Sequence, residues 1–198
     1  MDRRNFLKAI ALAGAVLSIK KSGAITLVSQ KLSAEAAKES YDLVAVMGGD
    51  PVSMFRKAIA EMGGMGKFVK KGQKVVVKPN IGWDKTPEMA ANTNPELVGE
   101  IVSQCYKAGA KEVIVFDHTC DNWQKSYTNS GIQEAVIKAK GKMLPANESS
   151  YYREVSIPNG VVLKTTMLHR AILDSDVWIN VPVLKNHGGA QMSISMKN

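Results

Sequence analysis

Residues 74–80, Lys74-Val75-Val76-Val77-Lys78-Pro79-Asn80, contain the stretch that decides the fold. Consecutive β-branched residues are typical of a strand that is buried on both faces of a sheet. Similar apolar runs occur at 113–116 and 176–181, and amphipathic helical patterns separate the three runs. Strands that alternate with helices predict an α/β fold, with a mostly parallel sheet and helices on both of its faces.

The helix with the clearest terminal signals is predicted at 94–109. Asn94 is a suitable N-cap, Pro95 a suitable first helical residue, and Gly109 a suitable end. A small β-hairpin insertion is predicted at 155–163, because Asn159-Gly160 between alternating apolar residues favours a tight primed turn. The remaining patterns predict a first strand at 41–47 and helices at 50–62, 130–139 and 167–173.

Residues 1–36 have the pattern of a twin-arginine signal peptide. Arg3-Arg4 precedes an apolar run at 9–17, which is shorter than the roughly 20 residues that a membrane-spanning helix needs. We therefore expect the twin-arginine translocation machinery to export the folded protein to the periplasm. Contact with the membrane is expected only through the signal segment, which would remain as an anchor if it is not cleaved. Residues 41–198 would then form a single α/β domain.

The net charge is +8 for the whole chain and +4 once residues 1–36 are removed, because that segment carries six basic and two acidic residues. The remaining basic residues are spread along the chain without a Lys/Arg block. This distribution favours small acidic ligands and argues against nucleic acid as a partner.

The two cysteines, Cys105 and Cys120, are predicted to be free thiols. Cys105 falls near the end of the 94–109 helix and Cys120 follows the next strand, so the two lie at opposite edges of the sheet. That separation, on the order of 20 Å for a strand of this length, exceeds the roughly 7 Å limit for a disulfide.

Polar residues follow three of the predicted strands. They are Lys78 and Asn80, then Asp117, His118 and Cys120, then Lys185 and His187. Because the carboxyl ends of parallel strands meet at one edge of a sheet, these residues are predicted to form one site. The alternative is that each belongs to an ordinary solvated loop.

Three kinds of chemistry suit these residues. Lys78 and Lys185 would bind a carboxylate or phosphate, Asn80 would orient it, and the amide of Gly188 would approach it closely. A catalytic role would use Asp117, His118, Lys185 and His187 for proton transfer and charge stabilisation. A divalent metal would instead use His118, Cys120 and His187, with Asp117 beside them.

Several motifs in this order resemble the domain of unknown function 362 family. The resemblance covers residues 74–198 and rests on the segments 75–80, 93–95, 108–115, 174–187 and 196–198. In that family the lysine and histidine of the Leu-Lys-x-His segment and a later Lys-Asn pair look like site residues, which here implies Lys185, His187, Lys197 and Asn198.

The resemblance also implies an association with ferredoxin-type iron–sulfur modules. This chain has no Cys-x-x-Cys motif, so we expect no iron–sulfur cluster bound by this chain alone. The family's sheet normally continues beyond the position that corresponds to Asn198, so the domain is expected to be incomplete at its C-terminus.

Three hypotheses about function follow, and the cofactor and the reaction stay unknown. The first is an exported protein that binds a small anionic ligand, metal or redox cofactor at the strand ends, with or without catalysis. The second is a non-catalytic accessory or maturation partner of an iron–sulfur or other redox protein, with an exposed apolar patch. The third is a truncated product that folds poorly.

Overall fold

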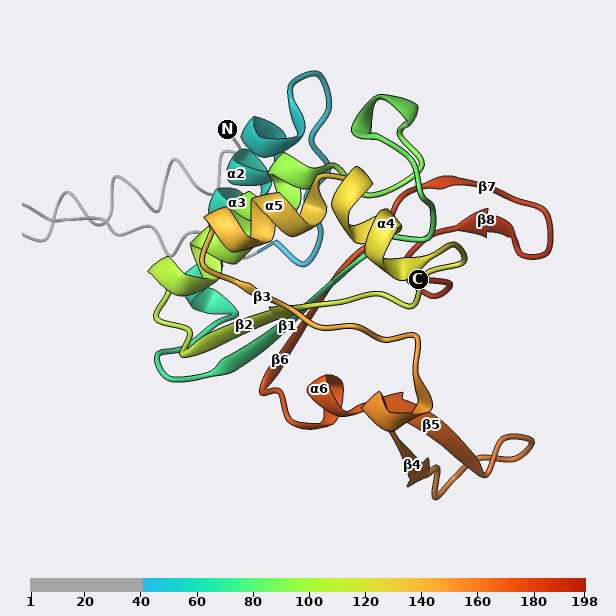
Figure 1. Cartoon of the computed structure of the whole chain (residues 1–198). Coiled ribbons are helices and arrows are strands. Elements are labelled where there is room, and N and C mark those ends of the chain that lie inside the picture. Colours follow the sequence, from blue (N-terminus) through green and yellow to red (C-terminus); the bar gives the residue numbers. More distant parts are fainter. Residues whose placement is uncertain (1–40) are drawn as a thin grey trace, which may run out of the picture. The chain divides into compact units, whose positions relative to one another are not determined.

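A four-stranded parallel sheet with the order β3-β2-β1-β6 organises the protein (Figure 1). The structure is a computed structural model that describes residues 41–198, so the predicted signal peptide at 1–36 lies outside the described residues. The strands are β1 (Lys74–Pro79), β2 (Glu112–Val115), β3 (Lys142–Met143) and β6 (Val177–Val181). This sheet confirms the predicted α/β fold.

One face of the sheet, here called the helix face, is covered by helices (Figure 1). They are α2 (Pro51–Glu61), α3 (Pro95–Lys107), α4 (Trp123–Asn129) and α5 (Ile132–Lys138). Alternate valines of β1, Val75 and Val77, pack against Val98 and Val102 of α3 in a large apolar core. Asn94 caps α3 by accepting a hydrogen bond from the Leu97 amide, as predicted.

The other face, here called the second face, has a thinner cover. It consists of the short helix α6 (Arg170–Leu173) and the antiparallel hairpin of β4 (Tyr152–Ser156) and β5 (Thr165–His169). Among residues 41–198, the buried core on this side comprises Val76, Phe116, Ala146 and Ala171. The hairpin insertion is therefore confirmed, and it lies on the side of the sheet opposite α2, α3 and α5 (Figure 1).

Shorter elements complete the described chain. They are the 3-10 turns η1 (Met65–Lys67), η2 (Pro87–Met89) and η3 (Ser149–Tyr151), and the hairpin of β7 (Lys185–His187) and β8 (Gln191–Ser193). The β7–β8 hairpin was not predicted, since its strands are only three residues each. No helix within residues 41–198 has the length and apolarity required to cross a membrane.

Three predicted elements differ from the structure. Residues 41–47 form no strand, because they pair with no neighbour and leave Leu43 84% exposed and Met47 95% exposed. Residues 167–169 belong to β5 and not to a helix, because pairing with β4 overrides the helical pattern. The turn at Asn159-Gly160 is not a primed turn, since neither residue has the positive φ that such a turn requires.

Candidate functional site

The carboxyl ends of β1 and β2 are joined by a buried ion pair. Lys78 Nζ donates to Asp117 Oδ1 at 2.6 Å, and the two side chains are only 15% and 6% exposed. Asp117 Oδ1 also accepts from the His118 amide at 2.9 Å, and Oδ2 accepts from the Ile81 amide at 2.7 Å. Asp117 Oδ1 therefore accepts two hydrogen bonds and Oδ2 accepts one, so the carboxylate joins the ends of β1 and β2 and keeps spare acceptor capacity on Oδ2.

Asn80 connects this pair to Lys185 of β7. The Asn80 side chain lies directly after β1 and is buried, and its Oδ1 accepts a hydrogen bond from Lys185 Nζ at 2.8 Å. Lys185 Nζ also donates to the carbonyl of Ala91. An ammonium group has three donors, so these two bonds leave one donor of Lys185 for another acceptor.

Lys185 carries a positive charge that no ion pair compensates within residues 41–198. Within the described residues, the only ion pair at the strand ends is the one between Lys78 and Asp117. Burial and the neighbouring charge of Lys197 lower the pKa of Lys185, while the nearby Cys120 and Asp117 oppose this effect. Desolvation and a like charge both disfavour the ammonium form, so an added anion would relieve this penalty.

Asn198 also bonds to these strand ends. Its Nδ2 donates to Asn180 Oδ1 at 2.7 Å and to the Lys78 carbonyl at 3.1 Å, and its Oδ1 accepts from Asn80 Nδ2 at 3.3 Å. Because β1 and β6 are paired in parallel with Lys78 opposite Asn180, these groups meet at one edge of the sheet. The structure thus brings together five predicted residues, which we call the strand-end site: Lys78, Asn80, Asp117, Lys185 and Asn198. The exposed Lys197 is near enough for its charge to act on Lys185.

Sequence reasoning missed three residues that support this site. Thr93 Oγ1 accepts from the Asn80 amide and donates to the Val181 carbonyl, both at 2.8 Å, so it fixes the positions at which β1 and β6 end. Tyr127 Oη accepts from the Asp117 amide at 3.0 Å. Ser193 lies opposite Lys185 in the β7–β8 hairpin, and its buried hydroxyl has no hydrogen-bond partner among the described residues. Of these three residues, only Thr93 belongs to a motif that stands out in the sequence, the segment 93–95.

Other predicted site residues lie apart from these contacts. The exposed His118 bonds to Asp117 only through its backbone amide. His187 Nδ1 accepts from the amides of Gly189 and Ala190 at 3.2 and 2.9 Å, so its ring closes its own turn. Gly188 is exposed in that same turn.

The residues predicted as metal ligands do not form a cluster. His118 and Cys120 are exposed, and His187 is engaged in its own turn. Within residues 41–198, no three His, Cys, Asp or Glu side chains are placed to hold a metal ion. Cys120 is a free, exposed thiol, whereas Cys105 is free and buried, and burial raises its pKa to about 12.

These features define a class: an α/β protein whose parallel sheet carries a site rich in lysine and asparagine at its strand ends. Residues 75–198 match the family described as Domain of unknown function (DUF362), and the chain belongs to this family.

A curated relative is the thylakoid-associated protein sll1697 of Synechocystis sp., which is 25% identical over 157 residues. The matched region covers 76% of this chain and 45% of the relative, so the chain spans less than half the length of that protein. No solved structure matches the chain.

Proposed function

We propose that this protein binds a small anion, a carboxylate or a phosphate, at the strand-end site. The observation that carries the proposal is the charge balance there. Lys78, Lys185 and the nearby Lys197 contribute three positive charges, and the single carboxylate of Asp117 already pairs with Lys78. An anion that bridges Lys185 and Lys197 would restore the balance and would accept the remaining donor of Lys185.

Neutral groups around Lys185 would complete such a site. The hydroxyl of Ser193 is buried beside Lys185 without a partner among the described residues, so it is available to donate to a bound oxyanion. Asn80 Oδ1 already fixes the Lys185 ammonium at 2.8 Å. A fixed cation with a neutral donor beside it suits the binding of an anion, whereas the Asp117 carboxylate is already paired with Lys78.

A second candidate function is docking of an iron–sulfur or other redox partner. The β7–β8 hairpin and the residues that flank it expose a group of apolar side chains close in sequence to Lys185 and Lys197. These are Leu184 (70% exposed), Met192 (49%), Ile194 (40%) and Met196 (101%). Exposed apolar side chains next to a charged site are typical of a surface that a partner covers.

Export to the periplasm belongs to the same proposal, because the Arg3-Arg4 segment is a twin-arginine pattern. Replacing both arginines by lysine should prevent export, as measured by cell fractionation. Equal export of the variant and the natural protein would refute this part.

The test of anion binding is a titration of the whole chain with inorganic phosphate, followed by amide NMR. We expect shifts at the amides of residues 78, 80, 117–120 and 185. We expect Lys185→Met to weaken binding about tenfold or more, because a charge-assisted hydrogen bond is lost.

The matched control is Lys57→Met, which removes the same charge from an exposed position on α2. It should leave phosphate affinity unchanged. Shifts spread over the surface, or equal losses in the two variants, would refute the proposal and favour general charge attraction. Repeating the titration with succinate would show whether carboxylates bind at the same residues.

A further inference from the structure

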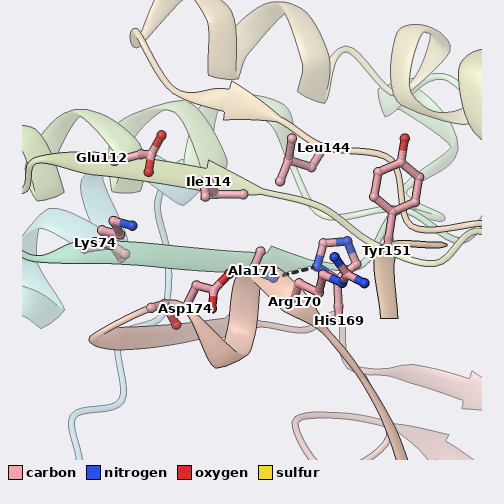
Figure 2. Close-up of a pocket in the computed structure, with 11 residues that line it drawn as sticks. Lys74, Glu112, Ile114, Leu144, Tyr151, His169, Arg170, Ala171 and Asp174 are labelled. Atoms are coloured by element: carbon pink, nitrogen blue, oxygen red, sulfur yellow. Dashed lines mark hydrogen bonds between the residues drawn. The ribbon is translucent and has the colours of Figure 1, made fainter. Parts of the chain in front are cut away.

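A cavity of about 230 Å³ lies on the second face of the sheet, remote from the strand-end site. Its walls come from the amino-terminal part of the sheet, from α6 and from the turn η3. We call it the second-face pocket, and it is lined by Lys74, Val75, Glu112, Ile114, Leu144, Tyr151, His169, Arg170, Ala171, Asp174 and Ser175 (Figure 2).

The interior of the second-face pocket is mainly apolar. Ile114 and Leu144 line it from the sheet side, and Ala171 lines it from α6 (Figure 2). An apolar cavity of about 150 Å³ in another protein binds benzene, so a cavity of 230 Å³ is large enough for one ring and a small substituent.

An aromatic wall closes one end of this pocket. His169 is buried, and its Nδ1 accepts from the Ala171 amide at 3.1 Å while Nε2 lies 3.2 Å from the Pro145 carbonyl. Because Nδ1 is an acceptor, the tautomer assigned to His169 has its proton on Nε2, which donates to the Pro145 carbonyl. Burial lowers the pKa of His169. Tyr151 lies parallel to the His169 ring at 5.9 Å between centroids. Phe116 also stacks on His169, at 3.9 Å between centroids, so these rings form a fixed apolar wall at this end of the pocket.

The polar side chains that line the second-face pocket differ in whether they already have an ion-pair partner and so in whether they can bind a charged ligand. Figure 2 shows Arg170 near Tyr151 and His169, whereas Lys74, Glu112 and Asp174 lie toward the other end. The Glu112 carboxylate already pairs with Lys142. The Arg170 guanidinium is exposed and has no ion pair within residues 41–198, so it is free to bind a carboxylate with two hydrogen bonds.

From these observations we propose that the second-face pocket binds a small aromatic monocarboxylate. The ring packs between Ile114, Leu144 and Ala171, and the carboxylate pairs with Arg170 at the aromatic end. This site is separate from the strand-end site, since none of the residues that line it belongs to that site.

The test is a titration of the whole chain with benzoate, with benzyl alcohol as the neutral analogue of the same size. Benzoate should shift the NMR signals of Ile114, Leu144 and Ala171. Arg170→Met should weaken benzoate binding about tenfold or more, through the lost charge-assisted bonds, and should leave the weaker binding of benzyl alcohol unchanged.

Two controls separate this proposal from the proposed function. Arg153→Met removes an exposed arginine of β4 that does not line the pocket, and it should leave benzoate affinity unchanged. Lys185→Met should leave benzoate affinity at the second-face pocket, read from the shifts of Ile114, Leu144 and Ala171, unchanged while it weakens phosphate binding at the strand-end site. Absence of benzoate shifts at the pocket residues, or equal benzoate affinity in Arg170→Met and the natural protein, would overturn the proposal.

Discussion

Glu100 on the helix face and Lys185 at the strand-end site both have a lowered pKa, for opposite reasons. Glu100 accepts from Arg56 Nε and Nη2, each at 2.8 Å, and this ion pair lowers its pKa to about 2 by favouring the charged form. Burial and the neighbouring Lys197 lower the pKa of Lys185 by disfavouring its charged form. The helix face therefore has a compensated charge, and the strand-end site has an uncompensated one.

This difference separates a structural charge from a candidate functional charge. The Arg56–Glu100 ion pair joins α2 to α3, and its two charges balance each other, so no ligand is expected to bind there. An uncompensated lysine costs stability in the free protein, and that cost is recovered only when an anion binds.

The largest expected loss of stability comes from removing the carboxylate of the strand-end site, which leaves more positive charge there without a partner. Asp117→Ala removes the carboxylate that pairs with Lys78 at 2.6 Å and leaves a buried cation. We expect a loss of about 3–5 kcal/mol in the free energy of unfolding, measured by urea denaturation. Phosphate should stabilise this variant more than it stabilises the natural protein. A loss below about 1 kcal/mol would mean that the ion pair is as weak as a surface pair.

The second prediction concerns how much the packing on the helix face contributes to the free energy of unfolding. Ile132 of α5 is fully buried, and Ile132→Ala should cost about 3 kcal/mol by removing buried methyl groups and leaving a cavity. Ile137 lies on the same helix and is 59% exposed, so Ile137→Ala should cost less than about 0.5 kcal/mol. Phosphate affinity of the folded fraction should stay unchanged in both variants. Similar losses for the two variants would contradict the described packing of α5.

A smaller effect is expected from the Arg56–Glu100 ion pair, in the dependence of stability on pH. Since the folded pKa of Glu100 lies below the unfolded value, its contribution to stability is complete above about pH 4.3 and is lost as the pH falls toward about 2. Arg56→Met should therefore flatten the acid limb of stability against pH, measured by urea unfolding at several pH values. An acid limb of unchanged slope would show that the Arg56–Glu100 pair is broken in solution.

The sheet and the meeting of its strand ends could be predicted from the sequence. Runs of Val and Ile have few alternatives to a buried parallel strand, and the order of helices between them fixes which strand ends share an edge. That is why Asn80, Asp117 and Lys185 were expected together, and the structure places them together.

Other features depend on contacts that no local pattern encodes. The strand pattern at 41–47 has no paired neighbour, and the helical pattern at 167–169 gives way to pairing with β4. His187 was predicted as a site residue from its position after a strand and from the family resemblance. The acceptance of hydrogen bonds by its Nδ1 from the amides of its own turn was not indicated by the sequence. The cysteines, by contrast, are free as predicted, because their positions follow from the order of the elements.

The uncompensated charge of Lys185 is tested most directly by calorimetric titration of the protein with sulfate from about pH 7 to about pH 10, a range in which sulfate does not titrate. Binding should weaken as the pH rises through the lowered pKa of Lys185, because the neutral amine does not attract the anion. Lys185→Met should bind sulfate weakly at every pH, and Lys57→Met should follow the natural protein. Sulfate affinity that is equal in Lys185→Met and the natural protein across this range would contradict an anion site at the strand ends.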